Sequence, residues 1–328
     1  MQHSVISRFQ GALLGSLIGE LVSHQPDQEL GSPVGWKSLH LAKSQPKPTQ
    51  SHLYIPQLSD WSKISTCGIE SLIDTGRLDI DDWIIHCRQT QPSLLELKGK
   101  AQSSEAAVLS LQMALFFHEN PEWLRQTIIQ AAAIWQVEPN ASAGVLAIAM
   151  AMAVMLTETI NPTTLIPHIL RGLGTQPTVL AYQLQQVQTL IEAGADLETT
   201  TRNVRREPAN LGNRGDASDM AIALAFYCFL YTPEDFRLCV LRAVRSGYHN
   251  PITAALTGAL AGVYQGINGI PVSWRLAALK IPALENRRQL TEQFFAVWLG
   301  VYDQNNIKDR YKQAAVAAPG VIQRRLLR

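Results

Sequence analysis

The sequence predicts an all-α fold, and three observations lead to that prediction. Apolar residues recur with the period of helices along most of the 328 residues, and no segment alternates long enough to indicate a sheet. Hydrophobic residues make up 46% of the chain and charged residues only 17%, so a large core can be buried. Several helices also begin with the same signal, a capping side chain directly before a proline. We therefore expect one compact multi-helix domain over residues 1–306.

The capping signal places the starts of individual helices. Proline is tolerated at the first helical position because its missing N–H is not needed there. The signal occurs at Asn120-Pro121, Asn161-Pro162, Thr232-Pro233 and Asn250-Pro251, and Asp79 is expected to cap a helix without proline. Together with the apolar period, these signals predict helices over about 7–22, 61–75, 80–90, 103–118, 121–135, 141–158, 162–172, 178–193, 218–230, 233–246, 251–267 and 287–302.

Two long loops and a basic tail separate or follow these helices. The loops are residues 23–58, rich in Pro, Gln, Ser and His, and residues 202–216, rich in Arg. Long loops in a helical protein are either mobile or functional. Residues 307–328 carry a local excess of Lys and Arg. We interpret this tail either as a solvated end or as a docking segment for an acidic protein partner.

Charge and cysteine content narrow the classes of function. Lys and Arg number 28 against 27 Asp and Glu, so the net charge of +1 creates no field that attracts nucleic acid. The four cysteines form no CxxC pair, which fits a reducing compartment. No secretory signal begins the sequence, and the apolar run 143–156 is shorter than the roughly 20 residues that a bilayer requires. We expect a soluble cytoplasmic protein with no membrane span and no nucleic-acid partner.

Glycines are spaced four residues apart in two of the predicted helices, so each set lines one helical face. Glycine costs about 1 kcal/mol in a helix interior relative to alanine. We therefore expect these helices to approach other helices closely, with each other as one candidate pair. The spacing does not tell whether the end of the second helix also binds a ligand. The two sets are Gly11, Gly15 and Gly19, and Gly258, Gly262 and Gly266.

These segments together resemble the ADP-ribosylglycohydrolase family, all-helical enzymes that use two magnesium ions to remove ADP-ribose from protein side chains. Residues 8–20 are similar to the family's RxxGxLLGxxxGD start, with Glu20 in the place of the aspartate. Residues 252–262 are similar to the family's last signature. The resemblance runs along nearly the whole chain and implies a compact ADP-ribosylglycohydrolase-like fold.

The resemblance also shows where the family's magnesium ligands should lie. The family supplies hard oxygen ligands from an early Thr-Asp-Asp-Thr string and from an Asp-x-Asp-Thr string before the glycine-striped helix. Here the first string reads Ser59-Asp60-Trp61-Ser62 and the second reads His249-Asn250-Pro251-Ile252. No Asp or Glu occurs from residue 236 to 284, so no local realignment supplies a carboxylate pair. The family's GNG string near the substrate is replaced by Ser103-Ser104-Glu105.

The candidate site residues follow from these positions. The relic catalytic candidates are Asp60, Glu20 and Asp27, the weak metal candidates are Ser59, Asp60 and His249, and the ligand-binding candidates are Tyr248, His249, Asn250 and Trp61. Several have a plain alternative: Asp60 as a helix cap, Trp61 as core packing, and His249 as an exposed loop residue. His86 and His118 lie on predicted helices without partners at metal spacing.

Three functional hypotheses stay open. The leading one is a non-catalytic binding, regulatory or structural module that has lost the dinuclear magnesium site, needs no cofactor, and still binds an ADP-ribosyl or nucleotide group. The alternative is an active ADP-ribosyl hydrolase with a rebuilt site, in which Asp60, helped by His249 and Asp27, holds a single Mg²⁺. The third is a subunit of a larger assembly that docks through its basic tail.

Overall fold

The computed structural model describes residues 3–24, 58–136, 142–157, 161–174, 178–205 and 217–300. Within these ranges all regular structure is helical, apart from one isolated bridge between Ala101 and Gln136. The predicted all-α fold class is therefore confirmed. Asp27, most of both predicted loops and the tail 307–328 lie outside the described residues.

The helices follow one another along the chain with short connections in most places. In chain order they are α1 (Val5–Ser23), α3 (Asp60–Thr75), α4 (Ile80–Thr90), η1 (Pro92–Leu97), α5 (Ser103–Leu109), α6 (Leu111–Phe116), α7 (Pro121–Trp135), α8 (Ala143–Thr157), η2 (Pro162–Thr164), α9 (Leu165–Leu173), α10 (Val179–Glu192), α11 (Leu197–Val204), α12 (Ala217–Leu230), α13 (Phe236–Arg245), α14 (Asn250–Gly269), α15 (Val272–Ala278) and α16 (Pro282–Trp298).

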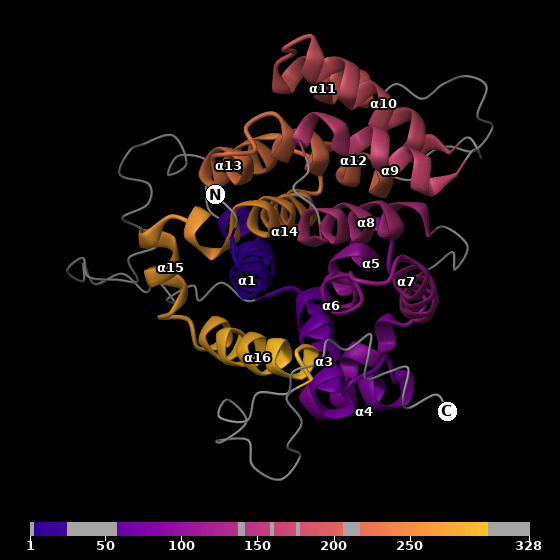
Figure 1. Cartoon of the computed structure of the whole chain (residues 1–328), viewed down its shortest axis with the longest axis vertical. Coiled ribbons are helices and arrows are strands. Elements are labelled where there is room, and N and C mark those ends of the chain that lie inside the picture. The colour runs from indigo at the N-terminus through magenta and orange to yellow at the C-terminus, as the bar shows by residue number, and fades with distance from the viewer. Residues whose placement is uncertain are drawn as a thin grey trace, which may run out of the picture.

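The two glycine-striped helices, α1 and α14, pack against each other in the middle of the molecule (Figure 1). A Cβ atom on Gly11 would overlap the backbone of Gly262, and one on Gly15 would overlap the backbone of Gly258. The order of these pairs makes the two helices antiparallel. The close helix approach predicted from the glycine spacing is confirmed, and the two striped helices are each other's partners.

Gly266 has a different role from the other glycines of its set. Its φ of 65° lies in the left-handed region, and α14 is kinked there. The kink frees the backbone N–H of Ile267, which donates to the Ser7 hydroxyl of α1 at 3.2 Å. The same residue that ends the straight part of α14 thus also fixes its register against α1.

The other helices surround this central pair. Helices α8, α12 and α13 contact α14, whereas α16 contacts α1 and α3. Figure 1 accordingly shows α3, α4 and α16 below the central pair and α10 to α13 above it. The buried side chains form one continuous cluster that runs through the whole arrangement.

Capping side chains begin several helices at the predicted positions. The side chains of Asp79, Asn120 and Asn161 accept hydrogen bonds from backbone N–H groups in the first turns of their helices. Elsewhere the prediction is wrong: the helix expected from residue 233 starts after Asp235, whose side chain supplies the cap. The helix expected over 103–118 is two helices, α5 and α6, which are separated at Ser110.

Among the described residues, one helix is long and apolar enough to cross a membrane by length and composition alone. It is α1, and 72% of the residues in its apolar window are buried inside the structure. The apolar run 143–156, which is too short to span a bilayer, lies in α8, and nearly all of this helix is buried. All four cysteines are free and buried as well.

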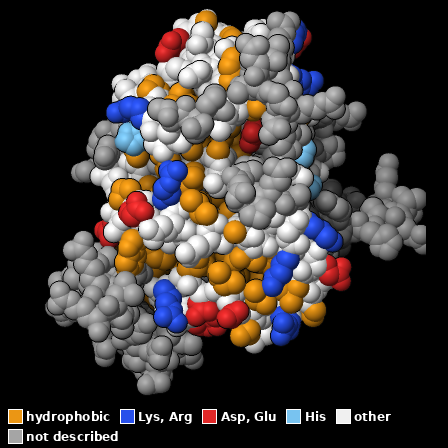
Figure 2. Space-filling model, turned by 90° about the vertical axis from the view of Figure 1, so that its right-hand side faces the viewer, with side chains coloured by type: hydrophobic (Ala, Val, Ile, Leu, Met, Phe, Trp, Pro, Cys, Tyr) orange, Lys and Arg blue, Asp and Glu red, His pale blue; other side chains and the backbone are white. Residues whose placement is uncertain are grey.

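The surface agrees with the low charge content of the chain. On the face drawn in Figure 2, described acidic and basic side chains are scattered among hydrophobic and uncharged ones. Neither sign of charge forms a continuous area on that face.

Candidate functional site

Three helix ends meet at the place where the family resemblance puts the metal-binding strings. Near the end of α1, Gly19 lies against Ala254 in the first turns of α14. The next residue, Glu20, bonds to the backbone of Ser59 at the start of α3. We call the residues that gather here, namely Glu20, 59–62 and 248–250, the helix-end site.

Glu20 is the buried carboxylate of the helix-end site, and only 2% of it is exposed. The backbone N–H of Ser59 donates to one of its oxygens, and the Ser62 hydroxyl donates to the other. These donors belong to the N-terminus of α3, where free N–H groups and the helix dipole favour a negative charge. Glu20 is therefore an internal anion that completes the start of α3.

Arg287 of α16 brings a positive charge to the same place. It is 4% exposed, and its Nη2 donates to the Ser62 carbonyl at 3.2 Å. Burial lowers the pKa of Arg287 to about 10, while attraction to Glu70 and Glu20 opposes that shift. Its Nε and Nη1 atoms are buried without a hydrogen-bond partner. The carboxylate of Glu20 thus has a cation from the protein itself nearby.

Asp60, the one acidic residue of the early string, does not direct its side chain into the protein. Ser59 caps α3, because its hydroxyl oxygen accepts from the Ser62 N–H at 3.3 Å. The interpretation of Asp60 as the cap is wrong, since this residue lies in the first turn and pairs with Lys63 at 2.7 Å. The Asp60 side chain is 46% exposed. Trp61 is partly buried against the core, consistent with its packing interpretation.

The start of α14 is a strained turn. His249 is exposed and has a φ of 40°, and it is the one described residue other than glycine with a positive φ. Thr253 fixes this turn: its hydroxyl donates to the Tyr248 carbonyl at 2.8 Å and its N–H donates to the His249 carbonyl at 2.9 Å. Asn250 is the first helical residue and not the predicted cap. Its Oδ1 is buried without a hydrogen-bond partner.

Aromatic rings and a cation lie beside this turn. The rings of Tyr248 and His249 are 5.3 Å apart and tilted by 32°. The Arg205 guanidinium lies over the Tyr248 ring, 5.7 Å from its centroid. Rings of this kind can stack on a base, and a guanidinium can pair with a phosphate. The start of α14 therefore offers contacts suited to a nucleotide.

Glu105, from the string that replaces the family's GNG, and the nearby Gln112 both have structural partners. Glu105 accepts a hydrogen bond from the Gln102 N–H at 2.8 Å, which closes the start of α5. Gln112 is fully buried, and its side chain bonds to Ser65 at 2.9 Å and to the Leu109 carbonyl at 2.5 Å. These side chains hold α5 and α6 in the core.

No group of three or more His, Cys, Asp or Glu side chains in the described ranges is arranged to hold a metal ion. His86 does have carboxylate neighbours that the sequence spacing did not suggest. Its ring nitrogens lie 3.2 to 3.5 Å from oxygens of Glu70, Asp74 and Asp82 on α3 and α4. These contacts join two neighbouring helices away from the start of α14.

Ser62 was placed in the early string without a role of its own, and Arg287, which lies beside the helix-end site, was not predicted. A signal for Arg287 exists in the helical period. The buried positions of α16 include Leu284, Thr291 and Phe294, and residue 287 falls on the same face. A charged residue on a buried face needs compensation from charged or polar groups. No comparable pattern marks Ser62.

The geometry defines a class of protein, an all-helical bundle that brings three helix ends together around a buried carboxylate. Residues 1–304 match the ADP-ribosylglycohydrolase family, and the chain belongs to that family. Among solved structures, it is similar to a chain described as an "ADP-ribosylglycohydrolase-related protein complex", with a TM-score of 0.58 and 17% identity. The similarity covers 89% of this chain and 98% of the other, and at this identity it shows the fold alone. No curated protein matches the sequence.

Proposed function

We propose that this member of the ADP-ribosylglycohydrolase family is a non-catalytic module that binds an ADP-ribosyl or nucleotide group without a dinuclear magnesium site. The observation that carries the proposal is that the Glu20 carboxylate is buried and hydrogen-bonded within the protein. Both of its oxygens accept hydrogen bonds from α3, and the buried Arg287 lies close enough for Glu20 to influence its pKa. Hydrogen bonds from the start of α3 thus engage both oxygens of the carboxylate, and Arg287 supplies a positive charge in its surroundings.

The residues around the helix-end site do not fit magnesium. Magnesium needs near-octahedral oxygen coordination and usually binds through carboxylates. Asp60 is engaged with Lys63, and Glu20 is engaged with α3. The start of α14 offers the His249 imidazole, which suits zinc, copper or nickel better than magnesium. We therefore derive no catalytic step through a metal ion.

The start of α14 supports the binding part of the proposal. The start of α14 is the N-terminus of a long helix, where an anion is favoured, and it carries the strained His249. The buried, unpartnered Oδ1 of Asn250 can accept a hydrogen bond from a ribose hydroxyl or a base amino group. Tyr248 adds an aromatic face and Arg205 adds a positive charge. Backbone strain of this kind persists where the surrounding structure holds it, and it clusters at ligand sites.

Calorimetry with magnesium chloride, combined with a turnover assay on an ADP-ribosylated arginine substrate, tests the loss of the metal site. We expect no saturable magnesium binding and no turnover, and Asp60→Ala should change neither measurement. Tight magnesium binding together with turnover that Asp60→Ala abolishes would instead establish the alternative, an active hydrolase with a rebuilt site.

Titration with ADP-ribose tests the binding part separately. Tyr248→Ala should weaken binding roughly tenfold, the effect of losing one stacked ring. Tyr182→Ala is the matched control, because Tyr182 is also a partly exposed tyrosine but lies on α10. If ADP-ribose does not bind, or if both variants bind as the unchanged protein does, the start of α14 is not the ligand site.

A further inference from the structure

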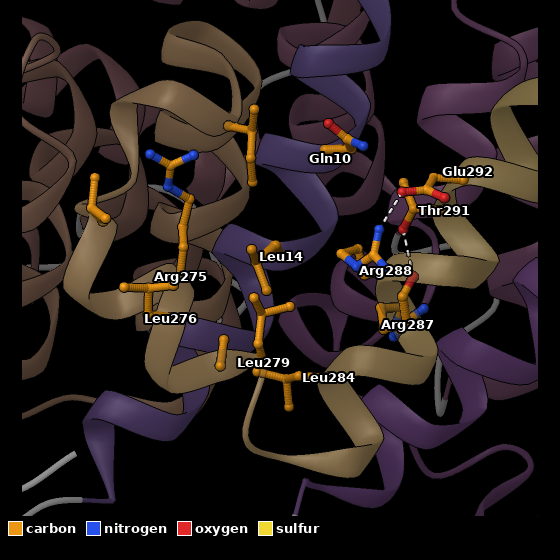
Figure 3. A pocket seen from close by; sticks show the side chains of 13 residues that line it. Gln10, Leu14, Arg275, Leu276, Leu279, Leu284, Arg287, Arg288, Thr291 and Glu292 are labelled. Atoms are coloured by element: carbon orange, nitrogen blue, oxygen red, sulfur yellow. Dashed lines mark hydrogen bonds and ion pairs between the residues drawn. The ribbon is translucent and has the colours of Figure 1, made fainter. Parts of the chain in front are cut away.

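A cavity lies between α1, α15 and α16, beside the kinked end of α14. Its volume is about 390 Å³, within the range of small-molecule sites. Figure 3 shows Leu14 of α1, Leu279 directly after α15 and Leu284 of α16 gathered in its middle. None of the residues proposed above for nucleotide binding lines this cavity.

The outer wall of the cavity is apolar and open to solvent. Val272 and Leu276 on α15 and Leu279 directly after it are 59%, 56% and 46% exposed, although all three are large hydrophobic residues. Contiguous exposed apolar surface on a protein indicates a binding site more often than isolated apolar residues do. This wall is therefore suited to contact with an apolar part of a ligand.

Positive charge flanks this apolar surface. Figure 3 shows Arg275 on one side of the leucines and Arg288 on the other. Arg288 is already paired, with Glu285 at 2.8 Å and with Glu292 at 2.5 Å. Arg275 forms no ion pair within the described part of the chain, and its Nε is buried without a hydrogen-bond partner. Arg275 is thus an unneutralised cation beside an apolar cavity.

Arg287 also lines the cavity, from the α16 side, although its charge is already attracted by Glu70 and Glu20. Arg287 is almost completely buried and leaves Nε and Nη1 without hydrogen-bond partners. Glu292 is the acidic residue in the lining, and its carboxylate is engaged by Arg288. A buried guanidinium without enough acceptors favours an anion at that place.

We propose that this cavity binds a small amphipathic anion, with an apolar chain on the leucines and a carboxylate at Arg275. The apolar part would displace water from Leu14, Leu276 and Leu279, and the carboxylate would accept hydrogen bonds from the guanidinium. A neutral molecule of the same shape lacks the second contact, and a cationic one is repelled by the arginines.

Calorimetry with sodium decanoate, kept below the concentration at which it forms micelles, tests this inference. Decanoate should bind one per chain, and at least roughly tenfold more tightly than 1-decanol or decyltrimethylammonium, because the alcohol offers Arg275 only an uncharged acceptor and the ammonium offers none. Arg275→Gln should weaken decanoate binding by about tenfold and leave 1-decanol binding unchanged.

Two matched variants control for general effects of charge and exposed apolar surface. Lys280→Gln removes an exposed positive charge just beyond α15, outside the cavity lining, and should leave decanoate binding unchanged. Leu276→Gln should weaken binding, whereas Leu238→Gln, at a 46% exposed leucine on α13, should not. The inference is overturned if decanoate does not bind, if 1-decanol binds equally well, or if Arg275→Gln and Lys280→Gln have the same effect.

Discussion

Glu20 differs from aspartate by one methylene group, and that difference changes which groups its carboxylate can reach. The family resemblance places an aspartate there, and the longer glutamate side chain reaches the backbone of Ser59 and the hydroxyl of Ser62. These two hydrogen bonds occupy about half of the lone-pair sites of the carboxylate and fix its orientation toward α3. The substitution therefore ties α1 to α3 in place of opening a coordination site.

His118 shows that a buried histidine can serve packing alone. It is 4% exposed, its ring stacks on Trp298 at 5.2 Å, and its Nδ1 donates to the Leu115 carbonyl at 2.6 Å. Burial lowers the pKa of His118 to about 4. The folded protein thus keeps this ring neutral at pH values where an unfolded chain would protonate it.

This difference makes stability depend on pH. Between the unfolded pKa near 6.5 and the folded pKa near 4, the unfolded chain binds more protons, so the free energy of unfolding falls as the pH is lowered through this window. The loss should be on the order of 3 kcal/mol. Urea unfolding of the unchanged protein and of His118→Phe, measured from pH 7 to pH 4, should show a weaker pH dependence in the variant.

His168→Phe serves as the control for that experiment. His168 is only partly buried, on α9, so its replacement should leave the pH dependence of the unchanged protein in place. An identical pH dependence in the protein and in His118→Phe would mean that His118 does not titrate differently on folding.

Sequence reasoning located most candidate residues but not their partners. It placed Ser59 and Asp60 at the start of a helix, yet gave the cap to Asp60 because either residue type can cap. It found Glu20 from a motif, whereas Ser62 and Arg287 come to it from α3 and α16. Contacts between distant segments depend on how helices pack, and a single sequence carries no direct record of that packing.

At the scale of helices, the seam between α1 and α14 is held by backbone contact. Carbonyl groups of one helix lie where side chains of the other would begin. Helix propensity alone would make alanine about 1 kcal/mol better than glycine at these positions. The geometry reverses that preference, because backbone cannot move aside as a flexible side chain can.

Gly262→Ala should therefore destabilise the protein by at least about 2 kcal/mol, as overpacking in a core does. The matched control is Gly172→Ala in α9, where the added Cβ would meet only the end of the flexible Met150 side chain, its sulfur and terminal methyl, which can move. That variant should change the free energy of unfolding by less than about 1 kcal/mol. Equal effects of the two substitutions in urea unfolding would contradict the backbone seam.

The glycine spacing predicted this seam, whereas α11 and α15 were not predicted. Repeated glycines leave a periodic signal because each one is needed at the same interface. Helix α15 is short and exposes several apolar residues, so it lacks the polar outer face on which the helical period depends. The cavity beside it could not be anticipated for the same reason.

At the scale of the whole molecule, the buried side chains form one connected core. Two distant aromatic pairs belong to this core. The ring centroids of Trp83 on α4 and Trp135 on α7 are 5.7 Å apart, and those of Phe236 on α13 and Trp274 on α15 are 6.0 Å apart. A single core across helices from both ends of the sequence favours cooperative unfolding.

We expect urea unfolding to follow one transition with the same midpoint by far-ultraviolet circular dichroism and by tryptophan fluorescence. Circular dichroism reports all helices, whereas fluorescence reports the surroundings of the tryptophans, so the two signals are independent. Two separated midpoints would show that parts of the described helices unfold as distinct units and that one domain is the wrong description.

The pairing of α1 with α14 also sets an order of events during synthesis. Helix α1 ends at Ser23, and its partner begins at Asn250, so ribosomes need roughly ten seconds or more to make the partner after α1 is complete. Throughout that interval α1, the described helix that is long and apolar enough to cross a membrane, lacks the backbone surface against which it packs in the folded protein. We therefore expect its apolar residues to stay uncovered by α14 during most of synthesis.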